Sequence, residues 1–451
     1  MTTLVMKFGG TSVGTPEAIG QAADIVLRQA QEWDRLVVVV SAMSGVTDQL
    51  IRGARTAACG DEGTYRTIVT ELRARHYTAI DALLRTAGTT RAESALPLEG
   101  ERGQLLAMVD DLLNEFSAFC HSVRVLGEVT HRAMDAITSL GERLNARILA
   151  ALLRQRGTES QAVDATELIV TDDAFQGAVP LTVATRAQSV KRLAPLFDAG
   201  AVAVVTGFIG ATEAGVTTTL GRGGSDFSAA ILGSALDADQ VWIWTDVDGV
   251  MTTDPRIVSD ARVIPVLSYS EVSELAYFGA KVLHPRTIRP VVERGIPLWV
   301  KNTFNPTCAG TRIINEPEST PGTVKAVTVI NGLSLVTVEG RGMLGVPGIA
   351  ARTFSAVASQ GASVLMISQS SSEQSICFVI PTDAVRPVIR ALEQEMALEL
   401  QRRDVDRVSS LDDVVIVTAV GAGMRGTPGV AYRIFGALGQ CDINVVAIAQ
   451  G

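Results

Sequence analysis

The C-terminal part of the chain contains an internal repeat, which constrains the fold more strongly than any single motif. Residues 334–369 and 414–450 share one order of features: an apolar run, a GxGxxG turn, a Pro-Gly pair, a segment with helical periodicity and a second apolar run that ends in glutamine. The repeated glycines are Gly340, Gly342 and Gly345 in the first copy and Gly421, Gly423 and Gly426 in the second. Because repeated units fold alike, one interpretation of the turn must hold for both copies.

A GxGxxG turn between a strand and a helix is typical of a dinucleotide site, but the repeat argues against one here. Each copy is too short for a dinucleotide-binding fold, and Asp442 precedes the second strand, where it could not reach a ribose hydroxyl. Pro428 suits the start of a helix. We therefore interpret the glycines as tight turns and exclude an NAD-linked dehydrogenase.

The first copy continues with SSSEQSICFVIPTDAVRPVIRALEQEM, which completes the order strand, helix, strand, strand, helix of a ferredoxin-like α+β unit. Such paired units resemble ACT domains, the amino-acid-sensing modules of metabolic enzymes. The resemblance implies a first ACT-like unit over residues 325–407 and a second, incomplete one over residues 408–451. ACT modules often interleave, so the strand at 324–330 is expected to join the second unit.

The residues before this repeat predict an α/β domain. Apolar runs such as LVMKF, RLVVVV and QVWIW alternate with segments of helical periodicity, as in a parallel sheet covered on both faces. Residues 60–156 predict a largely helical insertion, and residues 315–325 read as a linker. A length of 451 residues agrees with about three domains of ~150 residues.

Composition excludes several classes of partner. A net charge of −9 opposes sequence-independent binding of nucleic acid, which depends on neutralising phosphates. No apolar run approaches the ~18 residues of a membrane span, and the N-terminus lacks the pattern of a signal peptide, so we expect a cytoplasmic protein without a membrane partner. The five cysteines are scattered without a CxxC pair, which indicates neither a zinc site nor a disulfide framework.

Two glycine-rich turns follow predicted strands, where α/β sheets bind ligands. In KFGGTS, Lys7 and the amides of Gly9 and Gly10 can face an anion, although an ordinary turn with a surface lysine fits the same letters. In GRGGSD, Arg222 offers a fork suited to a carboxylate or phosphate, and Asp226 lies in the first turn of a helix, as in any capped helix. No P-loop pattern GxxxxGK[ST] occurs.

Two further turns carry charged residues. TDVDGVMTTDPR fails the spacing of a calcium loop, and a plain turn after an apolar strand explains it as well. In GAKVLHP, His284 precedes Pro285 and is more typical of a hydrogen-bonded structural histidine than of a catalytic base. The sequence contains no GxSxG and no HExxH.

These motifs together resemble one family. KFGGTS, SAMSGVTDQL, LGER, GRGGSD, TDVDGVMTTDPR and FGAKVLHPRTI, in this order and followed by two ACT-like units, resemble the aspartokinases of the amino-acid kinase superfamily over essentially the whole chain. The QSSSE stretch is nearest to threonine-sensitive forms, including the kinase halves of aspartokinase/homoserine dehydrogenases. The resemblance implies an amino-acid-kinase-like parallel-sheet sandwich over residues 1–318, which transfers the γ-phosphoryl group of ATP to the side chain of L-aspartate.

The resemblance also implies site residues. The catalytic residues would be Lys7, Asp226 and Lys281. The aspartate-binding residues would be Ser41, Thr47, Glu142, Arg222 and Ser225, with Glu142 of LGER, at the opening of a helix, on the ammonium. The ATP-binding residues would be Lys7, Gly9, Gly10, Thr245, Asp246, Met251, Arg256 and Lys281, although many relatives have tyrosine in place of Met251. Mg²⁺ is expected to enter on the ATP phosphates, without a protein metal site.

The repeat suggests how activity is regulated. Gln369 and Gln450 occupy matching strand ends, where an amide can both donate to and accept from a small polar effector, and the resemblance favours threonine over lysine. Both glutamines could instead hydrogen-bond between sheets. Open sheet edges predict a homodimer or larger assembly through the ACT-like units. Another kinase of the superfamily and a catalytically silent amino-acid sensor are the alternatives, and LGER together with Lys7 and Arg222 argues against them.

Overall fold

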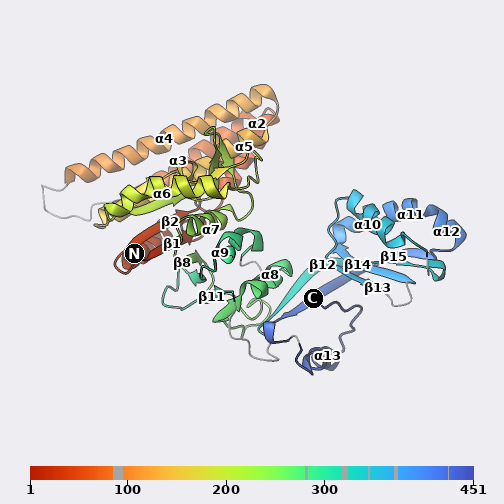
Figure 1. Cartoon of the computed structure of the whole chain (residues 1–451). Coiled ribbons are helices and arrows are strands. Elements are labelled where there is room, and N and C mark those ends of the chain that lie inside the picture. The colour runs from red at the N-terminus through yellow and green to blue at the C-terminus, as the bar shows by residue number, and fades with distance from the viewer. Residues whose placement is uncertain are drawn as a thin grey trace. The chain divides into compact units, whose positions relative to one another are not determined.

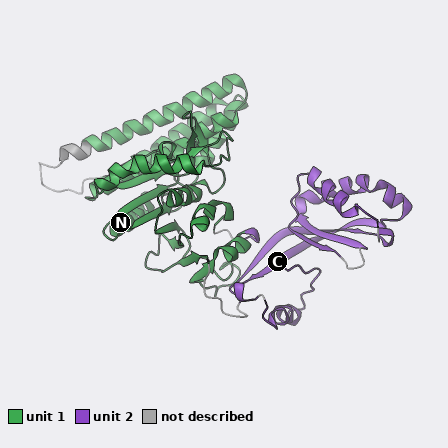
Figure 2. Ribbon diagram, viewed as in Figure 1, with its two compact units in different colours: residues 1–276, 281–318 green, residues 277–280, 319–451 purple. Residues whose placement is uncertain are grey.

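The computed structural model of the chain describes residues 1–84, 95–279, 283–315, 324–343, 346–369, 374–424 and 426–450. The chain forms two compact units (Figures 1 and 2). The first contains residues 1–276 and 281–318, and the second contains residues 277–280 and 319–451. The boundary between the two ACT-like units at residues 407 and 408 stays a prediction.

The first unit is built on an eight-stranded sheet in the order β3-β5-β2-β1-β8-β10-β11-β9. Its strands are β1 (Thr3–Phe8), β2 (Arg35–Val40), β3 (Ser160–Val163), β5 (Val202–Thr206), β8 (Gln240–Thr245), β9 (Val266–Ser268), β10 (Leu298–Asn302) and β11 (Thr311–Ile314). Neighbours from β3 to β10 pair in parallel, and β11 runs antiparallel to β10. Strands β1 and β5 are buried along their whole length, so the prediction of a covered parallel sheet is confirmed.

Helices cover this sheet, and a small second sheet lies beside it. The helices are α1 (Pro16–Gln29), α2 (Val46–Ala58), α3 (Glu62–Leu83), α4 (Ala95–Leu126), α5 (His131–Gln155), α6 (Thr182–Asp198), α7 (Gly224–Ala235), α8 (Tyr269–Tyr277), α9 (Pro285–Arg294) and the 3₁₀ turn η1 (Ala165–Glu167). The small sheet contains β4 (Val170–Thr171), β6 (Ile209–Thr212) and β7 (Thr217–Thr219). Helices α3 to α5 confirm the helical insertion. Among the described residues, no helix is long and apolar enough to cross a membrane.

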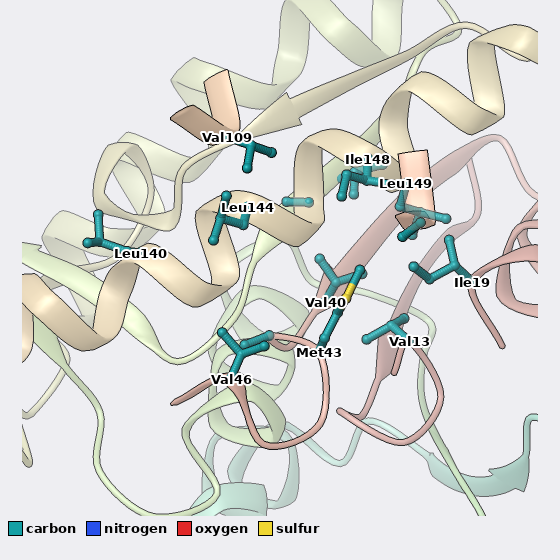
Figure 3. Close-up of a cluster of buried hydrophobic side chains, with 14 of the residues drawn as sticks. Val13, Ile19, Val40, Met43, Val46, Val109, Leu140, Leu144, Ile148 and Leu149 are labelled. Atoms are coloured by element: carbon teal, nitrogen blue, oxygen red, sulfur yellow. The ribbon is translucent and has the colours of Figure 1, made fainter. Parts of the chain in front are cut away.

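Helix α5 is the centre of the main hydrophobic core (Figure 3). Thr130 begins it by accepting a hydrogen bond from the Ala133 amide at 3.2 Å. Leu144 and Ile148 of this helix are fully buried in one cluster with Val40 at the end of β2. Burying each such side chain stabilises the fold by about 1.5–3 kcal/mol, so α5 is a rigid base for whatever it carries.

The second unit contains a four-stranded antiparallel sheet in the order β13-β14-β12-β15. Its strands are β12 (Ala326–Glu339), β13 (Met366–Gln369), β14 (Ser375–Pro381) and β15 (Arg407–Val420), and its helices are α10 (Ile349–Ser359), α11 (Val385–Glu395), α12 (Ala397–Arg402) and α13 (Val430–Gln440). Three 3₁₀ turns, η2 (Arg341–Met343), η3 (Thr382–Ala384) and η4 (Ala422–Met424), join them. The order β12, α10, β13, β14, α11 confirms a ferredoxin-like unit, and residues 326–330 pair with β15 of the second copy.

The expected strand ending at Gln450 is wrong for this structure. Residues 443–450 have no regular secondary structure, whereas the corresponding β13 of the first copy pairs with β14. Within the described part of the chain, no strand pairs with residues 443–450. A strand needs a neighbour for its backbone hydrogen bonds, and the apolar pattern alone does not supply one.

Candidate active site

Lys7 and Asp226 form an ion pair at the carboxyl edge of the large sheet. Lys7 lies near the end of β1, and its Nζ is 2.7 Å from Asp226 Oδ1. Asp226 lies in the first turn of α7, which begins after Gly223 in a left-handed conformation with φ of 71°. The side chains are only 11% and 18% exposed. A lysine held in this way presents positive charge to a ligand without free rotation of its side chain.

The turn after β1 packs against the loop after β2, and glycine makes this possible. A Cβ on Gly10 would lie 3.3 Å from the carbonyl oxygen of Ala42. The Ser44 amide donates to the Gly10 carbonyl at 3.2 Å, and the Ser41 amide donates to the Phe8 carbonyl at 3.2 Å. The Gly9 amide donates to the carbonyl of Trp244 in β8 at 3.2 Å. The ends of β1, β2 and β8 therefore meet at one place.

Glu142 reaches this loop from the middle of α5. The expectation that LGER opens a helix is wrong, because α5 begins at His131 and its apolar periodicity continues on both sides of Glu142. The side chain is only 3% exposed, and its Oε1 accepts a hydrogen bond from the Ala42 amide at 3.3 Å. Its Oε2 is buried without a hydrogen-bond partner, and burial raises the pKa of the carboxyl to about 8. A buried carboxyl with one free oxygen is suited to a cationic ligand.

Asn145 contacts the same loop, and sequence reasoning did not name it. It lies three residues after Glu142, on the same face of α5. Its Nδ2 donates to the Ser41 carbonyl at 2.7 Å, while its Oδ1 is buried without a partner. The one feature of the sequence that could have indicated Asn145 is its position three residues after Glu142 of LGER, on the same helix face. The half-buried Thr47 lies in the first turn of α2, directly after this loop.

Close packing of α5 on the loop explains the glycine of LGER. A Cβ on Gly141 would lie 2.9 Å from Ala42 Cβ and 3.4 Å from Val46 Cγ1. Real Cβ atoms do not pack this closely without a shift of their neighbours. Gly141 therefore allows Glu142 to approach the loop after β2.

The GRGGSD turn presents a free arginine beside a buried serine. Arg222 is exposed, and no ion pair to it occurs among the described residues. Ser225 is 9% exposed, and a Cβ on Gly207 would lie 2.7 Å from its Oγ. Arg222 thus keeps its guanidinium available for an anion, while Ser225 is fixed by packing against the end of β5.

The residues expected at the nucleotide are partly gathered at the same edge. Thr245 ends β8, next to β1 in the sheet, and its Oγ1 donates to Asp246 at 3.2 Å. Met251 forms an isolated bridge with Val263, and Arg256 is exposed and ion-paired with Asp254 at 2.6 Å. Lys281 lies outside the described residues.

His284 has a structural role in α9. It precedes the helix, and its Nδ1 accepts a hydrogen bond from the Arg286 amide at 3.2 Å. Because the ring nitrogen caps the helix, this contact supports the interpretation of His284 as a structural residue.

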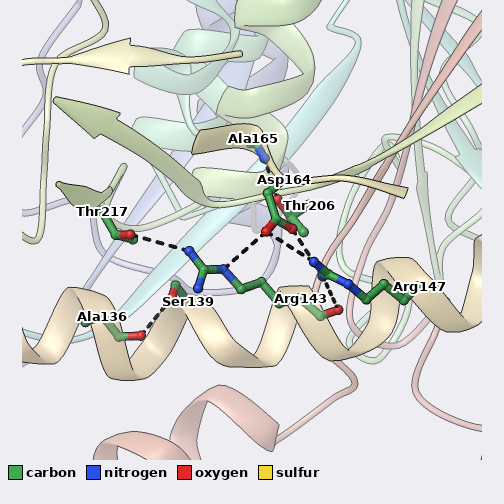
Figure 4. A network of polar contacts seen from close by, with 8 residues as sticks. All are labelled: Ala136, Ser139, Arg143, Arg147, Asp164, Ala165, Thr206 and Thr217. Atoms are coloured by element: carbon green, nitrogen blue, oxygen red, sulfur yellow. Dashed lines mark hydrogen bonds and ion pairs between the residues drawn. The ribbon is translucent and has the colours of Figure 1, made fainter. Parts of the chain in front are cut away.

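A polar network on another side of α5 fastens the helix to the strands (Figure 4). Asp164 accepts a hydrogen bond from Arg147 at 3.2 Å and lies 3.6 Å from Arg143 Nε. Arg143 Nη2 also donates to Thr217 Oγ1 of β7 at 3.4 Å. The arginine of LGER therefore links α5 to β7 and to the turn after β3, while the neighbouring glutamate serves the candidate site.

Comparisons with known proteins show which families the chain resembles. Residues 2–302 match the amino acid kinase family, and residues 336–396 and 417–451 match an ACT domain. The chain is 41% identical to bifunctional aspartokinase/homoserine dehydrogenase 1, chloroplastic, of Zea mays, over 99% of this chain and 47% of that protein. It is 33% identical to aspartokinase 3, chloroplastic, of Arabidopsis thaliana, over 100% of this chain and 77% of that protein.

Solved structures show the same likeness. The structure of E. coli aspartokinase III in complex with lysine and aspartate has a TM-score of 0.76 and 31% identity, over 100% of this chain and 93% of that one. The same enzyme in complex with aspartate and ADP has a TM-score of 0.73 at 31% identity, over 100% and 94%. The chain spans about half the length of the bifunctional relatives that it matches.

The parallel sheet, with its glycine-rich turns and the Lys7–Asp226 ion pair at its carboxyl edge, is the kind of α/β fold in which ligand sites lie at the strand ends. The chain belongs to the amino acid kinase family and, within it, to the aspartokinases that carry ACT domains.

Proposed function

We propose that this chain transfers the γ-phosphoryl group of ATP to the side-chain carboxylate of L-aspartate, which yields 4-phospho-L-aspartate and ADP. The observation that carries the proposal is the meeting of two features at the ends of β1 and β2: the Lys7–Asp226 pair and the loop held by the buried Glu142. One feature suits a phosphoryl group and the other suits an ammonium. The likeness to an enzyme solved with aspartate and ADP supports the assignment.

The residues divide between the two substrates. Glu142 takes the aspartate ammonium, Arg222 and Ser225 take its α-carboxylate, and Ser41 and Thr47 lie near the reacting carboxylate. A carboxylate is already a nucleophile, so the reaction needs no general base, and catalysis consists of positioning and charge neutralisation. Lys7, oriented by Asp226, neutralises charge on the transferring group.

The nucleotide would lie along the turn after β1 and the loop after β8. Gly9 and Gly10 let a phosphate approach the backbone closely, although the Gly9 amide itself donates to the Trp244 carbonyl, and Thr245 and Asp246 lie on the neighbouring strand end. Met251 and Arg256 are proposed to border the same site, and Lys281 is proposed to reach the ATP phosphates.

Magnesium is proposed to bind with ATP. Among the described residues, no cluster of three or more His, Cys, Asp or Glu side chains could hold a metal ion. Mg²⁺ in kinase sites is held largely by substrate phosphates and water, with one or two carboxylates, a mode that needs no dedicated cluster of protein ligands. When bound, the ion neutralises phosphate charge.

Acyl phosphate formation tests the function directly. The full chain is incubated with ATP, Mg²⁺ and L-aspartate in the presence of hydroxylamine, which traps an acyl phosphate as a hydroxamate. We expect product that depends on both ATP and L-aspartate. L-Glutamate serves as the matched control, because a superfamily kinase for glutamate would prefer it. Product with glutamate but none with aspartate would contradict the assignment, and no product with either would favour a silent sensor.

We further propose that the second unit binds an amino-acid effector, with threonine favoured over lysine. A cavity of about 320 Å³ lies between the end of β13 and the start of α10. Its lining includes Gln369, Met343, Gly348 and Ile376. A helix N-terminus favours a carboxylate, and the Gln369 amide can hold a small polar group, so a free amino acid suits the cavity. Gln450 is proposed as the counterpart in the second copy.

Replacing Gln369 with alanine is expected to relieve inhibition while leaving the uninhibited kcat unchanged. Coupling between separate sites is typically worth about 1–3 kcal/mol, so the inhibition constant for threonine should rise by roughly 5–150-fold. The measurement is activity titrated with threonine and lysine, separately and together. The control is Gln360→Ala, which replaces an exposed glutamine just after α10 and should leave inhibition unchanged. Inhibition by lysine alone would refute threonine as the effector.

The second unit is also proposed to mediate a homodimer or larger assembly. Strand β15 is an edge of its sheet, and Leu411, Val415 and Val417 along it are 50%, 52% and 47% exposed. An exposed apolar edge strand is a template for pairing. Light scattering of the full chain should give at least twice the monomer mass, and Val415→Lys should lower it. A stable monomer at micromolar concentration would contradict this prediction.

A further inference from the structure

Helix α5 carries a second buried carboxylate, Asp135, which the proposed chemistry does not use. Asp135 is only 1% exposed. It accepts hydrogen bonds from the Thr219 amide at 2.8 Å, from Thr219 Oγ1 at 2.8 Å and from the Gln176 amide at 3.0 Å. Burial raises the pKa of this carboxyl, while the donors oppose the rise. Burying a carboxylate costs folding free energy unless hydrogen bonds compensate for the lost water, and these three contacts supply that compensation. The burial of Asp135 at this position therefore indicates a role for the contacts that it makes.

The contacts of Asp135 hold both sides of the turn that leads to Arg222. Thr219 ends β7, three residues before Arg222. Gln176 has a left-handed backbone with φ of 67°, and a Cβ on Gly221 would lie 3.1 Å from its carbonyl oxygen. Gly221 is itself left-handed with φ of 77°. Asp135 therefore fixes the strand that enters the turn and the segment on which the turn rests.

Backbone hydrogen bonds complete this support. The Leu220 amide donates to the Phe208 carbonyl at 2.9 Å, and the Ala178 amide donates to the Thr219 carbonyl at 2.9 Å. The backbone from Thr219 to Gly221 is thus held from several sides. The exposed Arg222 side chain, by contrast, has no ion-pair partner among the described residues, so its direction depends on the backbone of this turn.

Asp135 and Glu142 are seven residues apart on α5 and so lie on one face of the helix, two turns from each other. We propose that Asp135 is a positioning residue for substrate binding, which acts through the 219–221 turn to aim Arg222 at the substrate α-carboxylate. One rigid helix then sets both recognition groups: Glu142 directly and Arg222 through Asp135. This inference rests on the proposed function.

The two backbone amides around this carboxylate can only donate: those of Gln176 and Thr219 both donate to Oδ2, and the Gln176 amide also donates to Oδ1 at 3.2 Å. Asparagine has the same shape, but its NH₂ group would face the Gln176 amide in either orientation, so a donor would face a donor even though the Thr219 hydroxyl can accept. The turn would then shift to relieve the conflict. Small displacements of positioning groups reduce catalytic efficiency by as much as about 100-fold.

The test is the kinetics of Asp135→Asn with ATP and L-aspartate. We expect the aspartate KM to rise by about 10-fold or more, while the ATP KM and kcat stay within about twofold, since only α-carboxylate binding is disturbed. Thr218→Val is the matched control. Thr218 is the neighbouring buried residue of β7, and its hydroxyl bonds to Thr171 Oγ1 at 2.7 Å, away from the turn. A similar rise in this control would mean that general loosening of β7 explains the effect, which would overturn the proposal.

A double-mutant cycle with Arg222→Ala decides whether the effect passes through Arg222. If it does, Asp135→Asn should change the aspartate KM by no more than about twofold in the Arg222→Ala background, because coupled residues are not additive. Additive losses would overturn the inference. Thr219→Val removes the hydroxyl donor to Asp135 and should raise the aspartate KM by a smaller factor. This variant replaces Asp135→Asn in the test if Asp135→Asn does not fold. Wild-type protein without aspartate-dependent activity would instead overturn the proposed function and this inference with it.

Discussion

Replacing Lys7 with alanine is expected to lower kcat by about 100-fold or more, the scale found when one preorganised electrostatic group is removed. The ammonium of Lys7 is mostly buried and held at 2.7 Å by Asp226, so neither water nor a neighbouring side chain can readily replace it. Steady-state kinetics with saturating ATP and aspartate measures the effect. Lys191→Ala, which removes an exposed lysine of α6, is the control and should leave kcat unchanged.

Loss of activity must be separated from loss of structure, because removing Lys7 leaves the Asp226 carboxylate without its cation. Lys7→Met retains most of the side-chain volume, and Lys7→Met combined with Asp226→Asn also removes the unpaired charge. The double variant should regain thermal stability relative to Lys7→Met but should stay inactive. Near-normal turnover in a folded Lys7 variant would refute the catalytic assignment.

Much of the fold could be predicted from local sequence. Runs such as RLVVVV have one interpretation in an α/β chain, because a continuous apolar strand must be covered on both faces. The repeat likewise indicated the ferredoxin-like order. The strand expected at Gln450 failed for a physical reason: pairing is a property of two segments, and the apolar pattern describes only one.

The candidate site was predictable only where chemistry is concentrated in a motif. Lys7 and Asp226 stand in glycine-rich turns, and the structure brings them into contact. Asp135 and Asn145 are single polar residues within an apolar helix, and their roles depend on which strands and loops that helix covers. Tertiary packing decides which strands and loops the helix covers. The 3.6-residue periodicity of the sequence shows only which face of the helix is buried.

The burial of Glu142 adds a property that LGER alone does not reveal. Since the pKa of the free carboxyl is raised to about 8, it is mostly protonated at pH 7. An ammonium favours the carboxylate, so binding aspartate should release a proton. Aspartate affinity should therefore increase as pH rises toward 8 and level off above it. Calorimetry in two buffers of different ionisation enthalpy measures the proton released, and Glu142→Gln should release none.

Replacing Glu142 with glutamine is expected to weaken aspartate binding while stabilising the free protein at alkaline pH. A hydrogen bond to a charged group is worth about 1.5–3 kcal/mol, so the aspartate KM should rise by roughly 10–150-fold, with the ATP KM unchanged.

The folded pKa of the Glu142 carboxyl, about 8, lies above the ordinary value of 4.5, so the unfolded chain loses this proton first. The free energy of unfolding of the wild type therefore falls as pH rises from 4.5 to about 8, and glutamine removes this loss. Denaturant unfolding at pH 5 and pH 8 measures it, with Glu101→Gln, which loses an ion pair to Arg154 of α5, as the control. A variant that binds its substrate worse yet unfolds less readily at pH 8 identifies Glu142 as a binding group whose burial costs stability, whereas unchanged aspartate KM would remove it from the site.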